Sequence, residues 1–148
     1  MGLWVSVAMK TVLTHGCFDV LHIGHIRLLK HARALGDELV VSLLSDEYVR
    51  AAKGPTRPIH RLNVRLEHIQ SLRFVDRVAV VDGPGPEAVQ KMMAEVCPDI
   101  YVKGREYIGK IPEMSLLDSL GVKVVYVSMV ANGKENSSSS RLIREFSD

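Results

Sequence analysis

Two histidines three residues apart carry the strongest chemical signal in this sequence. His22 and His25 flank Gly24, directly after a short apolar run over 11–14 and at the start of a helical apolar pattern over 22–35. Residues three apart share one face of a helix, so both imidazoles are expected at its first turn. Free backbone N–H groups and the positive dipole end favour an anion there, and glycine lets a ligand come close. The spacing predicts a phosphate site, and the expected ligand is a nucleoside triphosphate.

Two alternative motifs fit this sequence poorly. Metal pairs on helices more often use histidines four apart with a further ligand downstream, so we predict no metal site at His22 and His25. The stretch Gly104–Lys110 reads G-x-x-x-x-G-K, but Ile111 replaces the hydroxyl residue of a P-loop and Pro112 prevents the required helix. We therefore reject both the metal-binding histidine pair and the P-loop as interpretations of this sequence.

The turn before the histidines has both structural and functional interpretations. Gly16 permits an unusual backbone φ, Asp19 can cap a turn, and Cys17 and Phe18 lie between them. The same four residues could bind a nucleotide. Thr14, at the end of the preceding apolar run, could donate its hydroxyl to phosphate or simply reflect β-propensity.

Other polar residues are expected to complete the phosphate site. Lys103 ends a buried apolar run and is followed by Gly104, where a lysine without a ligand would be poorly placed. Ser138, Ser139 and Ser140 precede a helical pattern, and hydroxyls at a helix N-terminus form a phosphate site, although serine runs are more often linkers. We expect both groups to contact the nucleotide.

Apolar runs with strand character alternate with helical patterns along the chain. Such alternation implies parallel strands joined by crossover helices, hence a doubly wound, Rossmann-like α/β domain with three layers and a five-stranded sheet. Ligands bind outside the carboxyl ends of such strands, where strand order reverses. An order of 3-2-1-4-5 would bring the histidine segment beside Lys103 and Gly104. The expected strands are 11–14, 38–44, 77–81, 100–102 and 122–127, and the expected helices are 22–35, 46–52, 63–73, 87–96, 114–120 and a last one from the serines to residue 146.

Composition restricts the class of protein. The 148 residues, 47% of them hydrophobic, suit one domain, with 1–8 as an N-terminal extension. A net charge of +2 gives no argument for nucleic acid or membrane as a partner. Two distant cysteines, no apolar run of about 20 residues and no secretory layout at the N-terminus lead us to expect a cytoplasmic protein.

The G-x-F-D turn at Gly16–Asp19 and the H-x-G-H motif at His22–His25 resemble those of the cytidylyltransferase-like nucleotidyltransferase superfamily. The resemblance extends over nearly the whole chain from Met9. Within the superfamily the sequence is most similar to single-domain adenylyltransferases that act on heptose 1-phosphate, and next to glycerol-3-phosphate cytidylyltransferases. The further segments that carry it are Leu35–Asp37, Lys53–Gly54 with Arg57 and Pro58, Arg65, Lys103–Tyr107 and Ser138–Ser140.

The resemblance implies an enzyme that joins an NTP to a phosphorylated small molecule and releases pyrophosphate. It implies a Mg²⁺ ion that accompanies the NTP, and a homodimer. His22, His25, Lys53 and Lys103 are expected to be catalytic, while Glu106 and Tyr107 are expected on the acceptor side. The expected nucleotide contacts are Thr14, Gly16, Cys17, Phe18, Asp19, Gly24, Arg57, Arg65, Gly104 and Ser138–Ser140.

Three alternatives stay open at this stage. ATP is favoured over CTP because the Arg57 loop and the Lys103–Tyr107 segment look heptose-type, yet Glu106–Lys110 also fits the glycerol-type pattern. A nucleotide-binding module without catalysis is a second class, although the full set of histidines and lysines argues against it. A fragment of a class I aminoacyl-tRNA synthetase shares the His-Ile-Gly-His string, but the sequence has no K-M-S-K-S motif.

Overall fold

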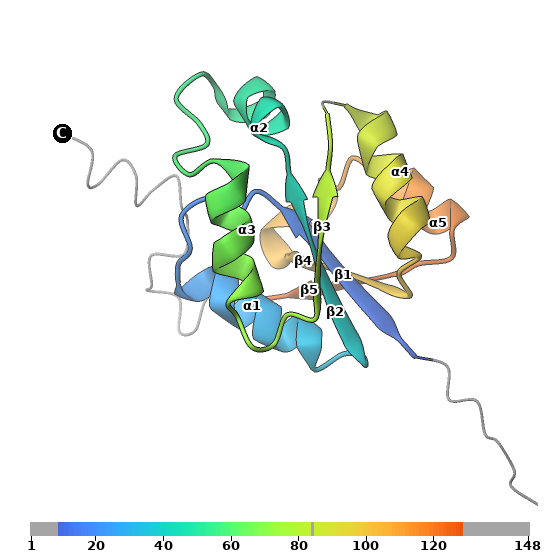
Figure 1. The fold of residues 1–148 in the computed structure, drawn as a ribbon. Helices are drawn as coiled ribbons and strands as arrows, with labels where there is room; N and C mark the ends of the chain where they lie inside the picture. The colour runs from blue at the N-terminus through green and yellow to red at the C-terminus, as the bar shows by residue number, and fades with distance from the viewer. Residues whose placement is uncertain (1–8, 84, 129–148) are drawn as a thin grey trace, which may run out of the picture.

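The protein folds around a five-stranded parallel sheet, seen in a computed structural model that describes residues 9–83 and 85–128 (Figure 1). The strands lie in the order β3-β2-β1-β4-β5, which confirms the predicted doubly wound topology. Their bounds are β1 Thr11–Gly16, β2 Glu38–Leu44, β3 Arg77–Val81, β4 Ile100–Gly104 and β5 Lys123–Val127.

The helices follow the predicted alternation, with ends displaced by no more than a few residues. The predicted extension over 1–8 and the predicted last helix, with Ser138–Ser140 at its start, lie outside the described residues. In residues 9–83 and 85–128 no helix combines the length and the apolar character needed to cross a membrane. The helices are α1 Ile23–Arg33, α2 Asp46–Lys53, α3 Leu62–Gln70, α4 Pro86–Val96 and α5 Met114–Ser119, and a 3₁₀ helix η1 spans Arg105–Tyr107.

Alternating side chains on the central strands build two apolar layers. Val12 packs into a cluster with α1 and α3, whereas its neighbour Leu13 packs into a cluster with α4 and α5. The two helix pairs accordingly cover opposite faces of the sheet (Figure 1). Both faces are buried, as expected for parallel strands, and this arrangement holds the strand ends rigidly in place.

The register of β1 brings two loops together at the carboxyl edge of the sheet. Thr14 is paired with Val41 of β2 on one side and with Val102 of β4 on the other. Its hydroxyl is fully buried and donates to the Val102 carbonyl oxygen at 3.0 Å. Thr14 therefore joins β1 to β4 inside the sheet, and the phosphate contact expected for it stays a prediction.

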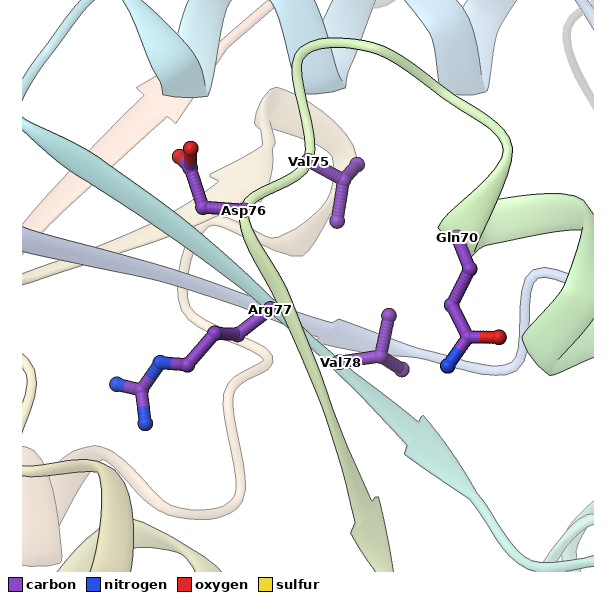
Figure 2. Close-up of a pocket in the computed structure, with 5 residues that line it drawn as sticks. All are labelled: Gln70, Val75, Asp76, Arg77 and Val78. Atoms are coloured by element: carbon purple, nitrogen blue, oxygen red, sulfur yellow. The ribbon is translucent and has the colours of Figure 1, made fainter.

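A pocket of about 260 Å³ lies where β3 begins (Figure 2). Gln70, Val75 and Asp76 line it together with the first residues of the strand, Arg77 and Val78. Asp76 also pairs with Arg33 of α1 at 3.1 Å. The pocket belongs to the amino edge of the sheet, opposite the carboxyl edge where ligands bind in doubly wound folds.

Candidate active site

The side chains of His22 and His25 cap helix α1 by accepting hydrogen bonds from backbone N–H groups at its N-terminus. His22 is the N-cap residue, and its Nδ1 accepts from the Gly24 N–H at 3.1 Å. The His22 N–H in turn donates to Nδ1 of His25 at 3.3 Å, and the two rings stack with centroids 3.8 Å apart. This is a capping box built from imidazoles. Since both Nδ1 atoms accept, each neutral ring carries its proton on Nε2, a donor available to a ligand.

Burial keeps both imidazoles neutral. It lowers the pKa of His22 below its ordinary value. Burial, aided by electrostatic interactions with His22 and Lys53, lowers the pKa of His25 from 6.5 to about 3. The pair therefore offers two neutral N–H donors near pH 7, at a helix end whose buried Gly24 leaves the backbone uncovered by a side chain.

The turn before the helix is strained where it meets His25. Phe18 has φ of 49°, the left-handed region that L-residues rarely adopt, and its buried ring lies 5.2 Å from the His25 ring. A Cβ on Gly16 would come within 3.2 Å of the Phe18 ring edge. The predicted glycine and phenylalanine thus set the position of His25, and the strain is of a kind concentrated at functional sites.

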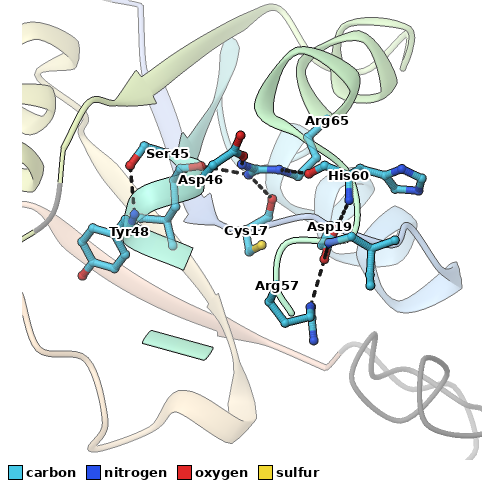
Figure 3. A network of polar contacts seen from close by, with 10 residues as sticks. Cys17, Asp19, Ser45, Asp46, Tyr48, Arg57, His60 and Arg65 are labelled. Atoms are coloured by element: carbon cyan, nitrogen blue, oxygen red, sulfur yellow. Dashed lines mark hydrogen bonds and ion pairs between the residues drawn. The ribbon is translucent and has the colours of Figure 1, made fainter. Parts of the chain in front are cut away.

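Asp19 anchors the following loop instead of facing solvent (Figure 3). Its carboxylate accepts from Arg57 Nε at 3.0 Å and from the backbone N–H groups of Ile59 at 2.7 Å and His60 at 2.8 Å. Burial acts to raise the pKa of Asp19, but these donors outweigh it and hold the pKa below its usual value. Asp19 and Arg57 therefore fix the loop over 57–60 against the turn.

Arg65 is the largest fully buried side chain of the described residues, and it joins four segments. Its guanidinium donates to the carbonyl oxygens of Cys17 at 3.0 Å, Leu44 at 2.8 Å and His60 at 2.9 Å, and to the Asp46 carboxylate at 2.6 Å (Figure 3). The sequence predicted a nucleotide contact at this position. The contacts described above give Arg65 a positioning role, and its nucleotide contact stays a prediction.

Two lysines complete the polar cluster at the carboxyl edge. Lys103, near the end of β4, donates to the His15 carbonyl oxygen at 2.6 Å and lies 4.7 Å from the Tyr107 ring centroid. Lys53, the exposed last residue of α2, lowers the pKa of both His25 and Lys103 through its charge. The structure thus brings together His22, His25, Lys53 and Lys103, the four residues predicted to be catalytic.

Gly104 and Cys17 line the same region. A Cβ on Gly104 would come within 2.4 Å of the Glu106 carboxylate, so glycine is required for that carboxylate to fold back over the strand end. Cys17 is buried, and burial raises the pKa of its thiol. The Cys17 side chain lies close enough to Tyr107 to influence its ionisation. Glu106 and Tyr107 therefore border the cluster, on the side expected to hold the acceptor.

His15 is a buried polar residue that the sequence interpretation missed. Its Nδ1 lies 3.1 Å from the Ser42 hydroxyl of β2, while its carbonyl oxygen holds Lys103. Burial, with the charge of Lys103, lowers the pKa of His15 from 6.5 to about 3. A histidine between the apolar start of β1 and the G-x-F-D turn was a signal that could have drawn attention to this position.

Removing the Arg65 guanidinium should destabilise the fold. We expect Arg65→Met to lower the free energy of unfolding by about 3 kcal/mol, because the carbonyl oxygens of Cys17, Leu44 and His60 and the Asp46 carboxylate lose a fully buried donor. Urea unfolding followed by circular dichroism measures this loss. Arg61→Met, at an exposed position one turn earlier, should change stability little, and an equal loss in both variants would contradict the role given to Arg65.

Stability should fall as the solution is acidified through the range set by the buried histidines. His15 has a folded pKa of about 3 against 6.5 unfolded, so between these values only the unfolded chain binds the proton. The stabilisation is present above pH 6.5 and is lost at up to about 1.4 kcal/mol per pH unit on acidification. We expect His15→Gln to reduce the drop between pH 6 and pH 4 by about 2 kcal/mol in urea unfolding. An unchanged drop would rule out His15 as its source.

Comparison with known proteins identifies the family. The sequence matches the cytidylyltransferase-like family over residues 13–146. It is 40% identical over 142 residues to the bifunctional protein HldE of Gluconobacter oxydans, covering 95% of this chain and 28% of the relative. It is 45% identical over 115 residues to HldE of Streptomyces coelicolor, covering 77% of this chain and 24% of the relative. The chain therefore spans about a quarter of the length of these curated relatives.

Solved structures of other proteins have the same fold. The lipopolysaccharide core biosynthesis protein from Thermoplasma volcanium superposes with a TM-score of 0.70 at 37% identity, over 84% of this chain and 100% of that one. Pantothenate synthetase from Thermus thermophilus shares the fold, with a TM-score of 0.63 at 17% identity over 90% of this chain and 61% of that one. The chain belongs to the cytidylyltransferase-like family and is a nucleotidyltransferase domain.

Proposed function

We propose that this domain transfers a nucleoside monophosphate from an NTP to a sugar phosphate of the heptose 1-phosphate type, with ATP as the favoured nucleotide. The observation that carries the proposal is the gathering of His22, His25, Lys53 and Lys103 at one edge of the sheet. Two imidazoles at a helix N-terminus and two ammonium groups beside them match the charge and the oxygen atoms of a triphosphate.

The reaction requires no covalent intermediate with the protein. An oxygen of the acceptor's phosphate attacks the α-phosphorus of the NTP, the bond from that phosphorus to the bridging oxygen of the β-phosphate breaks, and pyrophosphate leaves. Catalysis then consists of alignment and of stabilising the negative charge on the phosphoryl oxygens. Neutral imidazole donors and ammonium groups suit both tasks.

In this proposal, His22 and His25 contact the phosphate of the nucleoside monophosphate that is transferred. With both Nδ1 atoms occupied by backbone N–H groups, the two Nε2–H groups are left as donors for an anion, on rings that stack 3.8 Å apart. Such a fixed pair loses little side-chain freedom when a phosphate binds. We assign His22 and His25 to the phosphate oxygens that gain charge during transfer.

In this proposal, Lys53 and Lys103 contact the remaining phosphates of the NTP, which leave as pyrophosphate. Lys103 is held in place by the His15 carbonyl, whereas Lys53 is exposed at the end of α2. The cluster consists mainly of N–H donors, which suit phosphate oxygens better than they suit a cation. We therefore expect Mg²⁺ to enter on the phosphates of the NTP, as part of the substrate.

The choice of acceptor follows the resemblances. One relative in this fold, 37% identical, is described as a lipopolysaccharide core biosynthesis protein, and this description supports a sugar phosphate. The Glu106 carboxylate, folded over Gly104 at the edge of the cluster, is a suitable acceptor of hydrogen bonds from sugar hydroxyls. Glycerol 3-phosphate with CTP is the second candidate, because the segment Glu106–Lys110 also fits that pattern.

A substrate screen tests the proposal. Each of the four NTPs with Mg²⁺ is combined with heptose 1-phosphate, other sugar phosphates and glycerol 3-phosphate, and pyrophosphate release is measured. ATP with a sugar 1-phosphate should give the fastest release. If no pair gives release while calorimetry detects tight NTP binding, the domain is a nucleotide-binding module without catalysis.

Loss of the central imidazole should abolish most of the activity. We expect His25→Ala to lower kcat at least about a hundredfold, since one well-placed donor to a developing charge is worth roughly 3 kcal/mol. Initial rates of pyrophosphate release measure the effect. His31→Ala, an exposed histidine in the last turn of the same helix, should keep the wild-type kcat. Equal rates in the two variants would remove His25 from the mechanism.

A further inference from the structure

Tyr101 and Lys103 lie on the same side of β4, two residues apart. Tyr101 is fully buried in the apolar layer beneath α4 and α5, and Lys103 follows it at the carboxyl edge of the sheet. The Lys103 ammonium lies 6.0 Å from the Tyr101 ring centroid and 4.7 Å from that of Tyr107. The catalytic lysine therefore emerges from the apolar core between two aromatic rings.

A carboxylate from helix α5 reaches the same place. Glu113 is the N-cap residue of α5, but its side chain makes no capping hydrogen bond to that helix. Its Oε1 instead accepts a hydrogen bond from the Tyr101 hydroxyl. Burial, followed by the charge of Glu113, holds the pKa of Tyr101 above its usual value, so the phenol keeps its proton and remains the donor. The carboxylate is thus fixed beside the aromatic ring that lies next to Lys103.

The charges that face Lys103 come from several elements. Burial lowers the pKa of Lys103, and the exposed Lys53 of α2 lowers it further, whereas Glu113 from α5 and Glu106 from η1 raise it. His15 of β1 contributes its carbonyl oxygen, and its imidazole stays neutral above a pKa of about 3. Glu106 is exposed where the acceptor substrate is expected, so a bound substrate would contact and move its carboxylate. Glu113 is held by Tyr101, so its carboxylate would keep its position when substrate binds.

We propose that Glu113, anchored by Tyr101, is the counter-charge that keeps Lys103 an ammonium in the low-polarity end of β4, and hence a positioning residue for the transfer. The geometry carries the proposal: the hydroxyl of the fully buried Tyr101 holds the Glu113 carboxylate, which serves no helix cap, and the Lys103 ammonium lies 6.0 Å from the centroid of the same ring while it donates to an uncharged carbonyl. The link to catalysis rests on the function proposed above, but the charge state of Lys103 does not.

Nuclear magnetic resonance tests the charge state directly. Lysine labelled with ¹³C at Cε reports ionisation through its chemical shift, and Lys103→Arg assigns the signal. We expect the Lys103 titration midpoint to fall to a lower pH in Glu113→Gln, which keeps an oxygen for Tyr101 but loses the charge. Asp118→Asn, an exposed acid on the same helix, should leave the midpoint in place. Tyr101→Phe keeps the carboxylate and should titrate closer to wild type than Glu113→Gln does.

A kinetic arm tests the positioning role. The ratio of kcat at pH 9.5 to kcat at pH 7.5 should be roughly three- to tenfold lower in Glu113→Gln than in wild type, because Lys103 loses its proton earlier. A merely structural residue would lower kcat by the same factor at both pH values, and that result would overturn the positioning role. An unchanged Lys103 midpoint in Glu113→Gln would overturn the inference as a whole. If no substrate pair gives turnover, the proposed function fails, while the titration still decides the role of Glu113.

Discussion

The site depends on the buried guanidinium of Arg65. It binds the carbonyl oxygens at the ends of two neighbouring segments, Cys17 after β1 and Leu44 at the end of β2, and the Asp46 carboxylate in the first turn of α2. The histidines follow the first of these segments and Lys53 ends the last. The planar Arg65 guanidinium, with several fixed donors, therefore sets the relative positions of the turn that leads to the histidines and of helix α2, which ends at Lys53. A lysine could not do this, because its single ammonium cannot donate in so many fixed directions.

In this cluster the histidines are neutral hydrogen-bond donors, and the positive charges belong to the two lysines. Burial removes the charge of His22 and His25, so the pair offers directional hydrogen bonds with little net attraction for an anion. The two ammonium groups supply the attraction, and they come from opposite sides of the cluster, α2 and β4. If all four groups were cationic, their mutual repulsion would destabilise the free protein. The neutral pair at the centre avoids this cost, and it keeps its protons on the two Nε2 atoms.

The fold was predictable from the sequence because periodicity and parallel topology leave few choices. The apolar runs and their separating helices indicated a doubly wound parallel sheet, and the order 3-2-1-4-5 considered for such a sheet placed Lys103 beside the histidines. Roles within the turn were harder to predict. Asp19, Thr14 and Arg65 are polar residues expected at the phosphate site, yet each makes hydrogen bonds to distant backbone groups, which for Asp19 lie 40 and 41 residues away. A sequence shows that such a residue is polar, but its partners depend on tertiary contacts. Glu113 was missed for the same reason, because the phenol that holds it lies 12 residues away on β4.

The two lysines are held in different ways, and the difference bears on their tasks. Lys103 is fixed by the strand, by a carbonyl at 2.6 Å and by an aromatic ring, so its ammonium occupies one position before any ligand arrives. Lys53 ends a helix immediately before Gly54, whose φ is 104°, and its exposed side chain retains its rotamer freedom. A preordered ammonium gives up little entropy on contact with phosphate, whereas a free one must be ordered by the ligand. Lys103 is therefore the group suited to alignment. In the reaction proposed above, Lys53 would suit the departing pyrophosphate, because an exposed side chain can follow a group that moves and a fixed one cannot.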